Sequence, residues 1–274
     1  MARFLIVPQW QGSPAARAML LSDGAIAIAG DLPRAATEVL DVPLEAGESL
    51  GSGVLRKSAL SHTRTLIEEA MAQDSDEPTI IVGGDCSVSL AALAAIPGGT
   101  GDLAVLWCDA HPDLHTPDSS PSGALSGMAL RAVLGEGAKD LALSPGVDGG
   151  RTVLFGARSF DPGEEEALGL LGVRTLDVDS LHERPEALAE AVAATGARRV
   201  WVHVDVDVLD PSEIAGVSDP APFGASTAQL CTAIKRLRER IPLAGATIAG
   251  FAPRTPAAAV DDLGALLRVV GALA

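Results

Sequence analysis

The chain has 274 residues, of which 47% are hydrophobic, and its formal net charge is −16. That length and apolar content are sufficient for one large core, so we expect a single domain over residues 1–274. The negative charge excludes a nucleic-acid partner, because no basic stripe is present to neutralise phosphates. No apolar run approaches the roughly 18 residues that a membrane span needs.

Targeting signals and disulfides are not expected either. The N-terminal sequence MARFLIVPQWQG lacks the apolar length and the small-residue cleavage site of a signal peptide. The cysteines Cys86, Cys108 and Cys231 are few, odd in number and widely spaced, which argues against a disulfide scaffold. We therefore expect a cytoplasmic protein with reduced thiols and no membrane partner, in which Cys108 and Cys231 serve in packing.

Short apolar runs alternate along the chain with longer amphipathic segments. The predicted strands are, in chain order, 3–7, 79–84, 103–110, 152–159, 173–180, 199–208 and 246–252. Alanine- and leucine-rich segments typical of helices lie between them at 58–73, 184–196 and 226–241. The alternation predicts an α/β protein with a mainly parallel sheet of roughly eight strands in a three-layer αβα fold. Segments 115–124 and 209–226 carry Pro, Ser, Gly and Asp and are predicted to be active-site loops.

Three predicted strands end in residues that bind metals or carry protons. These residues are Asp85 and Cys86 after the second strand, Asp109, His111, Asp113 and His115 after the third, and His203, Asp205 and Asp207 in the sixth. Alternation in an extended backbone would direct Asp109, His111 and Asp113 to one side. Buried carboxylates without compensation are costly, so we predict two divalent cations at the carboxyl edge of the sheet. Carboxylates with some imidazole favour Mn²⁺, with zinc and iron as alternatives.

The motifs GGDCS, DAHPD and DVDVLDP resemble the three signature motifs of the ureohydrolases, the family of arginase, agmatinase and formiminoglutamase. The resemblance runs from about residue 79 to about residue 256. It implies a three-layer αβα fold with a bridged dimanganese centre, whose metal-bound hydroxide splits a guanidinium or amidine carbon. It also implies a homo-oligomer, since family members form trimers or hexamers, although no stretch here identifies an interface.

The resemblance implies six metal ligands. One cation would be held by Cys86, Asp109, Asp113 and Asp205, and the other by Asp109, His111, Asp205 and Asp207, with Asp109 and Asp205 bridging. The family usually has histidine in place of Cys86, and a thiolate is softer and negatively charged, so we expect a weaker or altered first site. A packing role for Cys86 is the alternative. A nucleophilic role is disfavoured, because neighbouring carboxylates raise the pKa of a thiol.

The segment FGARSFDPGEEE resembles the arginase segment whose acids receive the α-amino group of the substrate, which implies that role for Asp161 and Glu164. By itself, DPGE predicts only a turn into a helix with acids at its N-terminus. Ser122 lies where the family's serine contacts the α-carboxylate, and His115 replaces an asparagine that does the same. The resemblance therefore implies a small amino-acid substrate rather than agmatine.

Three positions depart from the arginase pattern. Ser126 stands where arginases carry a proton-shuttling histidine, Ala124 replaces a carboxylate-binding asparagine, and Gly250 stands where a glutamate binds the guanidinium. Arginine would lose its proton shuttle and a partner for its charge. An N-hydroxyguanidine is less basic and a better electrophile, and the room near Ser126 or Gly250 could hold its extra oxygen. We therefore hypothesise a substrate of this kind, Nω-hydroxy-L-arginine, giving hydroxyurea and L-ornithine.

Two alternatives stay open. The first is an arginase, or a hydrolase of another guanidino acid, in which His115 or His203 carries the proton. Strand alternation puts His203 on the side of Asp205, where a hydrogen bond to a metal ligand is the other interpretation. The second alternative is a catalytically silent family member that acts as a binding or regulatory subunit.

Overall fold

The computed structural model describes residues 2–73 and 77–274. Eight strands of this described part form one sheet. They are β1 (Arg3–Ile6), β2 (Thr37–Val39), β3 (Thr79–Val82), β4 (Leu103–Cys108), β5 (Thr152–Phe155), β6 (Arg174–Leu176), β7 (Arg199–Asp205) and β8 (Leu243–Ala249). Their order is β2-β1-β3-β8-β7-β4-β5-β6, and every pairing is parallel. The predicted parallel sheet is confirmed.

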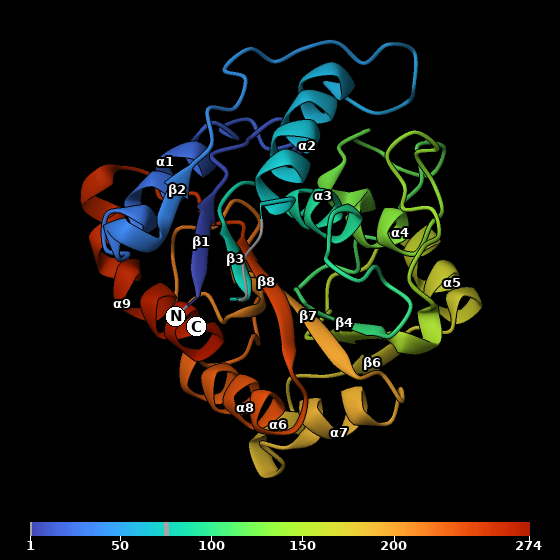
Figure 1. The fold of residues 1–274 in the computed structure, drawn as a ribbon, viewed down its shortest axis with the longest axis vertical. Helices are drawn as coiled ribbons and strands as arrows, with labels where there is room; N and C mark the ends of the chain where they lie inside the picture. Colours follow the sequence, from blue (N-terminus) through green and yellow to red (C-terminus); the bar gives the residue numbers. More distant parts are fainter. Residues whose placement is uncertain (1, 74–76) are drawn as a thin grey trace.

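Helices cover both faces of the sheet. In the described residues they are α1 (Leu20–Ala29), α2 (Lys57–Met71), α3 (Val88–Ala94), α4 (Ala129–Val133), α5 (Pro162–Leu171), α6 (Ser180–Glu183), α7 (Ala187–Ala193), α8 (Thr227–Arg240) and α9 (Pro256–Leu273). Helices α1 and α6 to α9 pack on one face, and α2 to α5 pack on the other (Figure 1). The three-layer αβα prediction is therefore confirmed.

The apolar strands form because both of their faces are buried. All six residues of β4 are buried, with Trp107 packed toward the layer of α2 to α5 and Cys108 toward the opposite layer. Cys231 of α8 lies in the same core as Cys108, so the packing predicted for both cysteines is confirmed. Burial of such strands supplies most of the driving force for folding, at about 25 cal/mol per Å² of apolar surface.

Two local expectations were wrong. The sixth predicted strand ends at Asp205, and residues 206–208 form a 3₁₀ turn, because the Asp205 carboxylate accepts a hydrogen bond from the Asp207 backbone N–H at 3.0 Å. Residues 109–113 likewise do not continue β4 as an extended run, because the chain bends at Ala110 and His111, and Asp113 has a left-handed φ of 54°. These turns, and not strand alternation, direct the acidic side chains.

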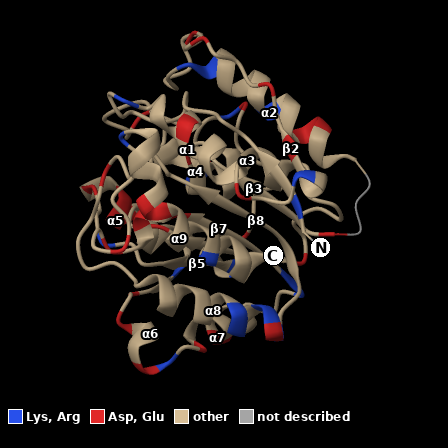
Figure 2. Cartoon of the chain, turned by 90° about the vertical axis from the view of Figure 1, so that its left-hand side faces the viewer, with Lys and Arg blue, Asp and Glu red and all other residues tan. Residues whose placement is uncertain are grey.

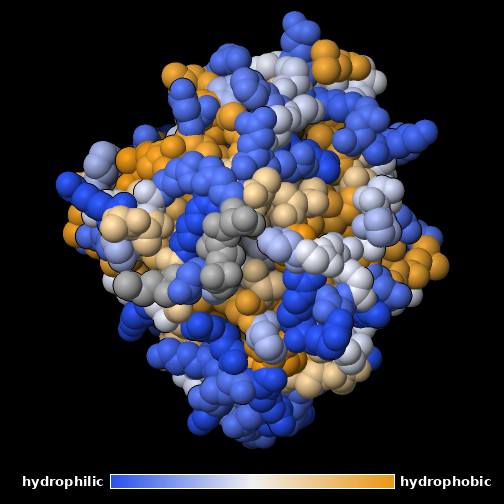
Figure 3. Space-filling model, viewed as in Figure 1, coloured by the Kyte–Doolittle hydropathy of each residue, from blue (hydrophilic) through white to orange (hydrophobic). Residues whose placement is uncertain are grey.

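The surface carries its charges in an uneven way. Lys and Arg are dispersed, whereas Asp and Glu gather around α5 in Figure 2. Hydrophilic residues occupy most of the face shown in Figure 3 and are interrupted by hydrophobic ones. Within residues 2–73 and 77–274, no helix is long and apolar enough to cross a membrane.

Candidate metal centre

The loops that follow β3, β4, β7 and β8 enclose a cavity of about 460 Å³ at the carboxyl edge of the sheet. The strand order β3-β8-β7-β4 explains this convergence, because parallel neighbours end at the same edge. All six predicted metal ligands line the cavity, namely Cys86, Asp109, His111, Asp113, Asp205 and Asp207. The same cavity is lined by the four residues predicted to bind the amino-acid part of a substrate, His115, Ser122, Asp161 and Glu164, and by Ser126.

Cys86 lies against the acidic cluster. Its Sγ is 3.0 Å from Asp205 Oδ2 and 3.8 Å from Asp109 Oδ2, and the residue is only 6% exposed. Burial, followed by the charges of Asp113 and Asp205, raises the pKa of the Cys86 thiol well above its ordinary value. Without a cation the thiol is therefore protonated and donates to Asp205, which excludes it as a free nucleophile.

His111 forms a second group with two carboxylates. Its Nδ1 is 3.0 Å from Asp207 Oδ2 and 3.6 Å from Asp109 Oδ1. Burial lowers the pKa of His111, but its hydrogen bonds with Asp109 and Asp207 outweigh that effect and raise the pKa to about 12. The Asp207 carboxylate also accepts a hydrogen bond from the Ala110 N–H at 2.9 Å, which fixes the turn after β4.

His111 compensates the carboxylates of this cluster only in part. Burial, and then Asp207, raises the pKa of Asp205 to about 7, while burial, and then Asp109, raises that of Asp207 to about 6. The pKa values of Asp109 and Asp113 are raised by burial and by their acidic neighbours as well. Asp113 Oδ2 is buried without a hydrogen-bond partner in the described chain. Such a set of buried oxygen donors, with an imidazole and a thiol, fits divalent cations, whose charge would replace the protons that these acids hold in the metal-free protein.

Asp85 anchors a wall of the cavity rather than facing the other acids. Its carboxylate accepts hydrogen bonds from the Gly12 N–H at 2.9 Å, from Gln9 Nε2 at 3.2 Å and from the Ser87 N–H at 3.1 Å. A Cβ at Gly12 would lie 2.1 Å from this carboxylate, so the close approach requires glycine. Asp85 thereby holds the segment after β1 against the loop that carries Cys86.

The part of the cavity where the amino-acid group of a substrate is predicted to bind, called the amino-acid end below, is built on the start of α5. His115 Nε2 lies 2.9 Å from Asp161 Oδ2, and His115 Nδ1 lies 3.2 Å from Ser119 Oγ. Glu164 accepts the Leu114 N–H on one carboxylate oxygen at 3.0 Å and the Asp161 N–H on the other at 3.1 Å. Asp161 and Glu164 also form the capping box of α5. Glu164 therefore positions its neighbours, and Asp161 is the acid with a more open side chain.

His203 lies beneath the cavity rather than on its wall. It is fully buried in β7, its Nδ1 is 2.7 Å from Ser89 Oγ, and its ring stacks on Trp107 with the ring centroids 3.7 Å apart. Burial lowers the pKa of His203 to about 3, so its imidazole is neutral. The Asp109 carboxylate, with Oδ2 3.9 Å from His203 Nε2, separates it from a substrate in the cavity.

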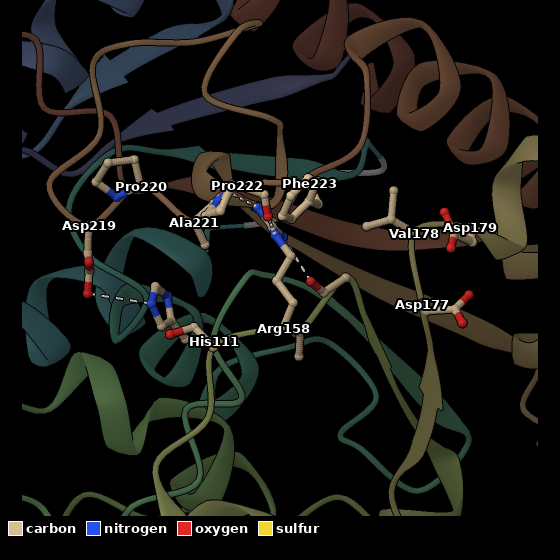
Figure 4. Close-up of a pocket in the computed structure, with 13 residues that line it drawn as sticks. His111, Arg158, Asp177, Val178, Asp179, Asp219, Pro220, Ala221, Pro222 and Phe223 are labelled. Carbon is tan, nitrogen blue, oxygen red and sulfur yellow. Dashed lines mark hydrogen bonds and ion pairs between the residues drawn. The ribbon is translucent and has the colours of Figure 1, made fainter.

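Asp219 was not among the predicted site residues, although its loop was. It lines the main cavity and also a neighbouring cavity of about 410 Å³, and its Oδ2 is 3.5 Å from His111 Nε2 (Figure 4). Arg158 holds this loop, because its guanidinium donates to the carbonyls of Gly156, Asp207, Ala221 and Pro222. A lone aspartate in a loop carries no spacing signal, so its place in the cavity could not be predicted.

The sequence profile described as "Arginase family" matches residues 12–266. The chain belongs to the arginase family. Its curated relatives include an N(omega)-hydroxy-L-arginine amidinohydrolase from Streptomyces lavendulae, 34% identical over 183 residues, which are 66% of this chain and 62% of that protein. An arginase from Staphylococcus aureus is 35% identical over 162 residues, which are 56% of this chain and 54% of that protein. The alignments thus span little more than half the length of these relatives.

The similarity of fold extends further along the chain. An arginase from Entamoeba histolytica, solved in complex with L-ornithine, superposes with a TM-score of 0.87 over 100% of this chain and 99% of its own, at 20% identity. Because only 20% of the residues are identical, this superposition shows a shared fold and nothing about the substrate. It shows that the cavity described above lies in a complete arginase-like sheet.

Proposed function

We propose that the chain is a dinuclear amidinohydrolase that converts Nω-hydroxy-L-arginine and water into hydroxyurea and L-ornithine. The observation that carries the proposal is the composition of one cavity. A cluster of buried acids lies at one part of its wall, and a His115–Asp161 pair lies at another. Ser126 and Gly250 also line it, and the resemblance places them where arginases carry a proton-shuttling histidine and a guanidinium-binding glutamate. The relative from Streptomyces lavendulae, whose name states this activity, supports the substrate class.

The acidic cluster would hold two divalent cations, which we propose to be Mn²⁺. Cys86, Asp109, Asp113 and Asp205 would bind one, and Asp109, His111, Asp205 and Asp207 would bind the other. When bound, such a pair of cations activates water at neutral pH and stabilises negative charge on the group under attack. The protein's own part is to keep these donors buried and close together, as the short contacts of Cys86 and His111 illustrate.

The amino-acid end would bind and orient the substrate. Asp161 is an acceptor for an α-amino group, while His115 and Ser122 offer donors for an α-carboxylate. The His115–Asp161 contact of 2.9 Å keeps the two groups together, and Glu164 fixes Asp161 through its backbone N–H. Orientation of this kind converts a loose encounter into a defined approach to the reacting carbon. We also keep His115 as a proposed proton carrier for the departing amine.

The guanidino end favours a less basic head group. Gly250 has a φ of 85°, and a Cβ there would lie 2.1 Å from Asp205 Oδ1, so this position has no room for a carboxylate side chain. The room expected beside Gly250 for the extra oxygen of the substrate is therefore occupied by Asp205. Ser126 is also too short to carry a proton to a leaving group in the way that an imidazole does. An N-hydroxyguanidine needs both functions less than arginine does, because it is less basic and more electrophilic.

The test is product formation from L-arginine and Nω-hydroxy-L-arginine in parallel with Mn²⁺-loaded protein. We expect kcat/KM to be at least about tenfold higher for the hydroxylated substrate, which corresponds to about 1.4 kcal/mol of preferential transition-state binding. Cys86→His should strengthen cation binding and reveal whether the thiolate affects this preference. Equal turnover of arginine would contradict the proposed substrate, and cation binding without turnover of either compound would support a silent family member.

Arginase activity is the second candidate. It is favoured by the Staphylococcus aureus arginase, which is 35% identical to this chain over the aligned residues. In that case Asp219 and His115 are the side chains on the cavity wall that could replace the missing glutamate and histidine. The parallel assay distinguishes the two candidates by the product, since arginine yields urea and the hydroxylated substrate yields hydroxyurea.

A further inference from the structure

We propose that His203 is a ligand of the cation nearest Cys86, so that this site combines a thiolate, an imidazole and carboxylates. The inference rests on the proposed two-cation centre. It goes beyond the six ligands that the resemblance implies, because it adds a residue from the interior of β7.

The distances between donor atoms support one shared ion. Ligand atoms of Cys86, Asp109 and His203 all lie within 4.8 Å of one another, and all three residues are buried. His203 Nε2 and Asp109 Oδ2 are 3.9 Å apart, which is too far for a hydrogen bond. Two donors that bind one cation at about 2.0–2.3 Å each lie about 3–4.4 Å apart. The spacing is therefore that of two ligands rather than of a hydrogen-bonded pair.

The orientation of the imidazole supports the same role. His203 Nδ1 forms a hydrogen bond with Ser89 Oγ at 2.7 Å, and stacking on Trp107 fixes the plane of the imidazole ring. Trp107 Nε1 also donates to Asp109 Oδ2 at 3.3 Å, so one indole orients both proposed ligands. Metal-binding histidines usually hydrogen-bond through the nitrogen that does not face the metal.

The second nitrogen has no other explanation in the described residues. His203 is 0% exposed, and its Nε2 has no hydrogen-bond partner among residues 2–73 and 77–274. A histidine retained only for packing would leave a buried polar atom unsatisfied, which proteins rarely do. A cation between His203 and Asp109 would satisfy this nitrogen and compensate the carboxylate at the same time.

The donor set also predicts which metals this site prefers. A thiolate with an imidazole is softer than a set of carboxylates, so this site should bind Zn²⁺, Co²⁺ or Fe²⁺ more readily than its neighbour does, although it can still take the Mn²⁺ proposed above. The neighbouring group of Asp109, His111 and Asp207 is dominated by oxygen and suits Mn²⁺. The two sites of this chain therefore differ in metal preference.

The experiment is a Co²⁺ titration of the metal-free protein. Calorimetry measures the number and affinity of the bound equivalents, and visible and near-ultraviolet absorption reports their ligands. We expect wild-type protein to bind two equivalents and to develop a thiolate-to-cobalt charge-transfer band. His203→Ala should weaken one equivalent by about 100-fold or more and change the visible spectrum, since a ligand matters at least as much as its hydrogen-bond partners. His115→Ala, the same substitution at a histidine on the other part of the cavity, should keep both equivalents.

Ser89→Ala is the second variant, because it leaves the imidazole in place and removes only its orienting partner. It should weaken the same equivalent by about tenfold. Two tightly bound equivalents with an unchanged spectrum in His203→Ala would overturn the ligand role, and if that variant does not fold, unchanged binding by Ser89→Ala would overturn it. Wild-type protein that binds no Co²⁺ would overturn the two-cation centre as well. If Co²⁺ binds as expected but neither guanidino substrate is turned over, the proposed function is overturned and the ligand role of His203 is not.

Discussion

At the scale of single residues, Asp219 is the acid that faces both cavities. Its side chain is 87% exposed and lies 3.5 Å from His111 Nε2, close enough to meet a cationic head group near the metal centre. Because an exposed ion pair contributes up to about 1 kcal/mol, Asp219→Asn should raise KM for the proposed guanidino substrate by about fivefold with little change in kcat. Steady-state kinetics would measure this. Asp179→Asn is the control, since Asp179 lines only the neighbouring cavity, and an equal rise in both variants would exclude a specific contact.

At the scale of secondary structure, the start of α5 links stability to the part of the cavity where we propose that the amino-acid group of the substrate binds. Glu164 accepts two backbone hydrogen bonds there, so Glu164→Ala should lower the free energy of unfolding by about 1–3 kcal/mol. Urea unfolding followed by circular dichroism would measure the loss. Glu165→Ala, in the same helical turn but exposed, should change stability by less than about 0.5 kcal/mol. Equal losses in the two variants would show that the capping contacts are not the cause.

Gly250, directly after β8, allows the Asp205 carboxylate to pack against the backbone at the metal centre because glycine has no side chain. Gly250→Ala would place its Cβ 2.1 Å from Asp205 Oδ1 and would force an alanine into a φ of 85°. We expect a loss of more than about 1 kcal/mol in stability together with weaker cation binding. Gly264→Ala in α9 is the matched control, because nothing lies within 4 Å of its Cβ, and it should stabilise the helix by up to about 1 kcal/mol. Unaltered cation binding by Gly250→Ala would contradict this account.

At the scale of the whole molecule, the buried acids make the metal-free protein sensitive to pH. Burial, with help from neighbouring acids, raises the pKa of Asp205 to about 7 and that of Asp207 to about 6, so the folded state keeps protons that the unfolded chain releases above about pH 4. Stability contributed by these protons is lost as the pH rises toward 7. His203 has the opposite effect on stability. Burial lowers its pKa to about 3, so below about pH 6.5 the unfolded chain binds one proton on this imidazole that the folded state does not.

Two protons on Asp205 and Asp207 less one on His203 give a fall in the stability of the metal-free protein of about 1.4 kcal/mol per pH unit between about pH 5 and 6, and the raised pKa values of Asp109 and Asp113 act in the same direction, so we expect at least this slope. Urea unfolding of chelator-treated protein at several pH values would measure it. Protein saturated with Mn²⁺ should show the reverse, because bound cations favour the ionised carboxylates. A metal-free protein whose stability rises over this window would contradict the assignment of protonated acids.

Much of the architecture was predictable because long apolar runs bury both faces of a parallel strand. The short strand β2 was missed, since Thr37 and Glu38 at the edge of the sheet are only partly buried and carry no apolar pattern. The end of β7 was misplaced for a different reason. A hydrogen bond from the Asp207 backbone to the Asp205 carboxylate turns the chain there, and alternating valines do not reveal it.

The three acidic motifs were sufficient to indicate a metal centre at the carboxyl edge of the sheet, because their residue types and their positions after apolar runs are local properties. Which donors come together depends on contacts between segments far apart in the chain. Cys86 meets Asp205, His115 meets Asp161, and Ser89 orients His203 only after β3, β4, α5 and β7 have packed. The free nitrogen of His203 and the carboxylate of Asp219 have no signature along the chain, since the role proposed for each depends on what folding places opposite it.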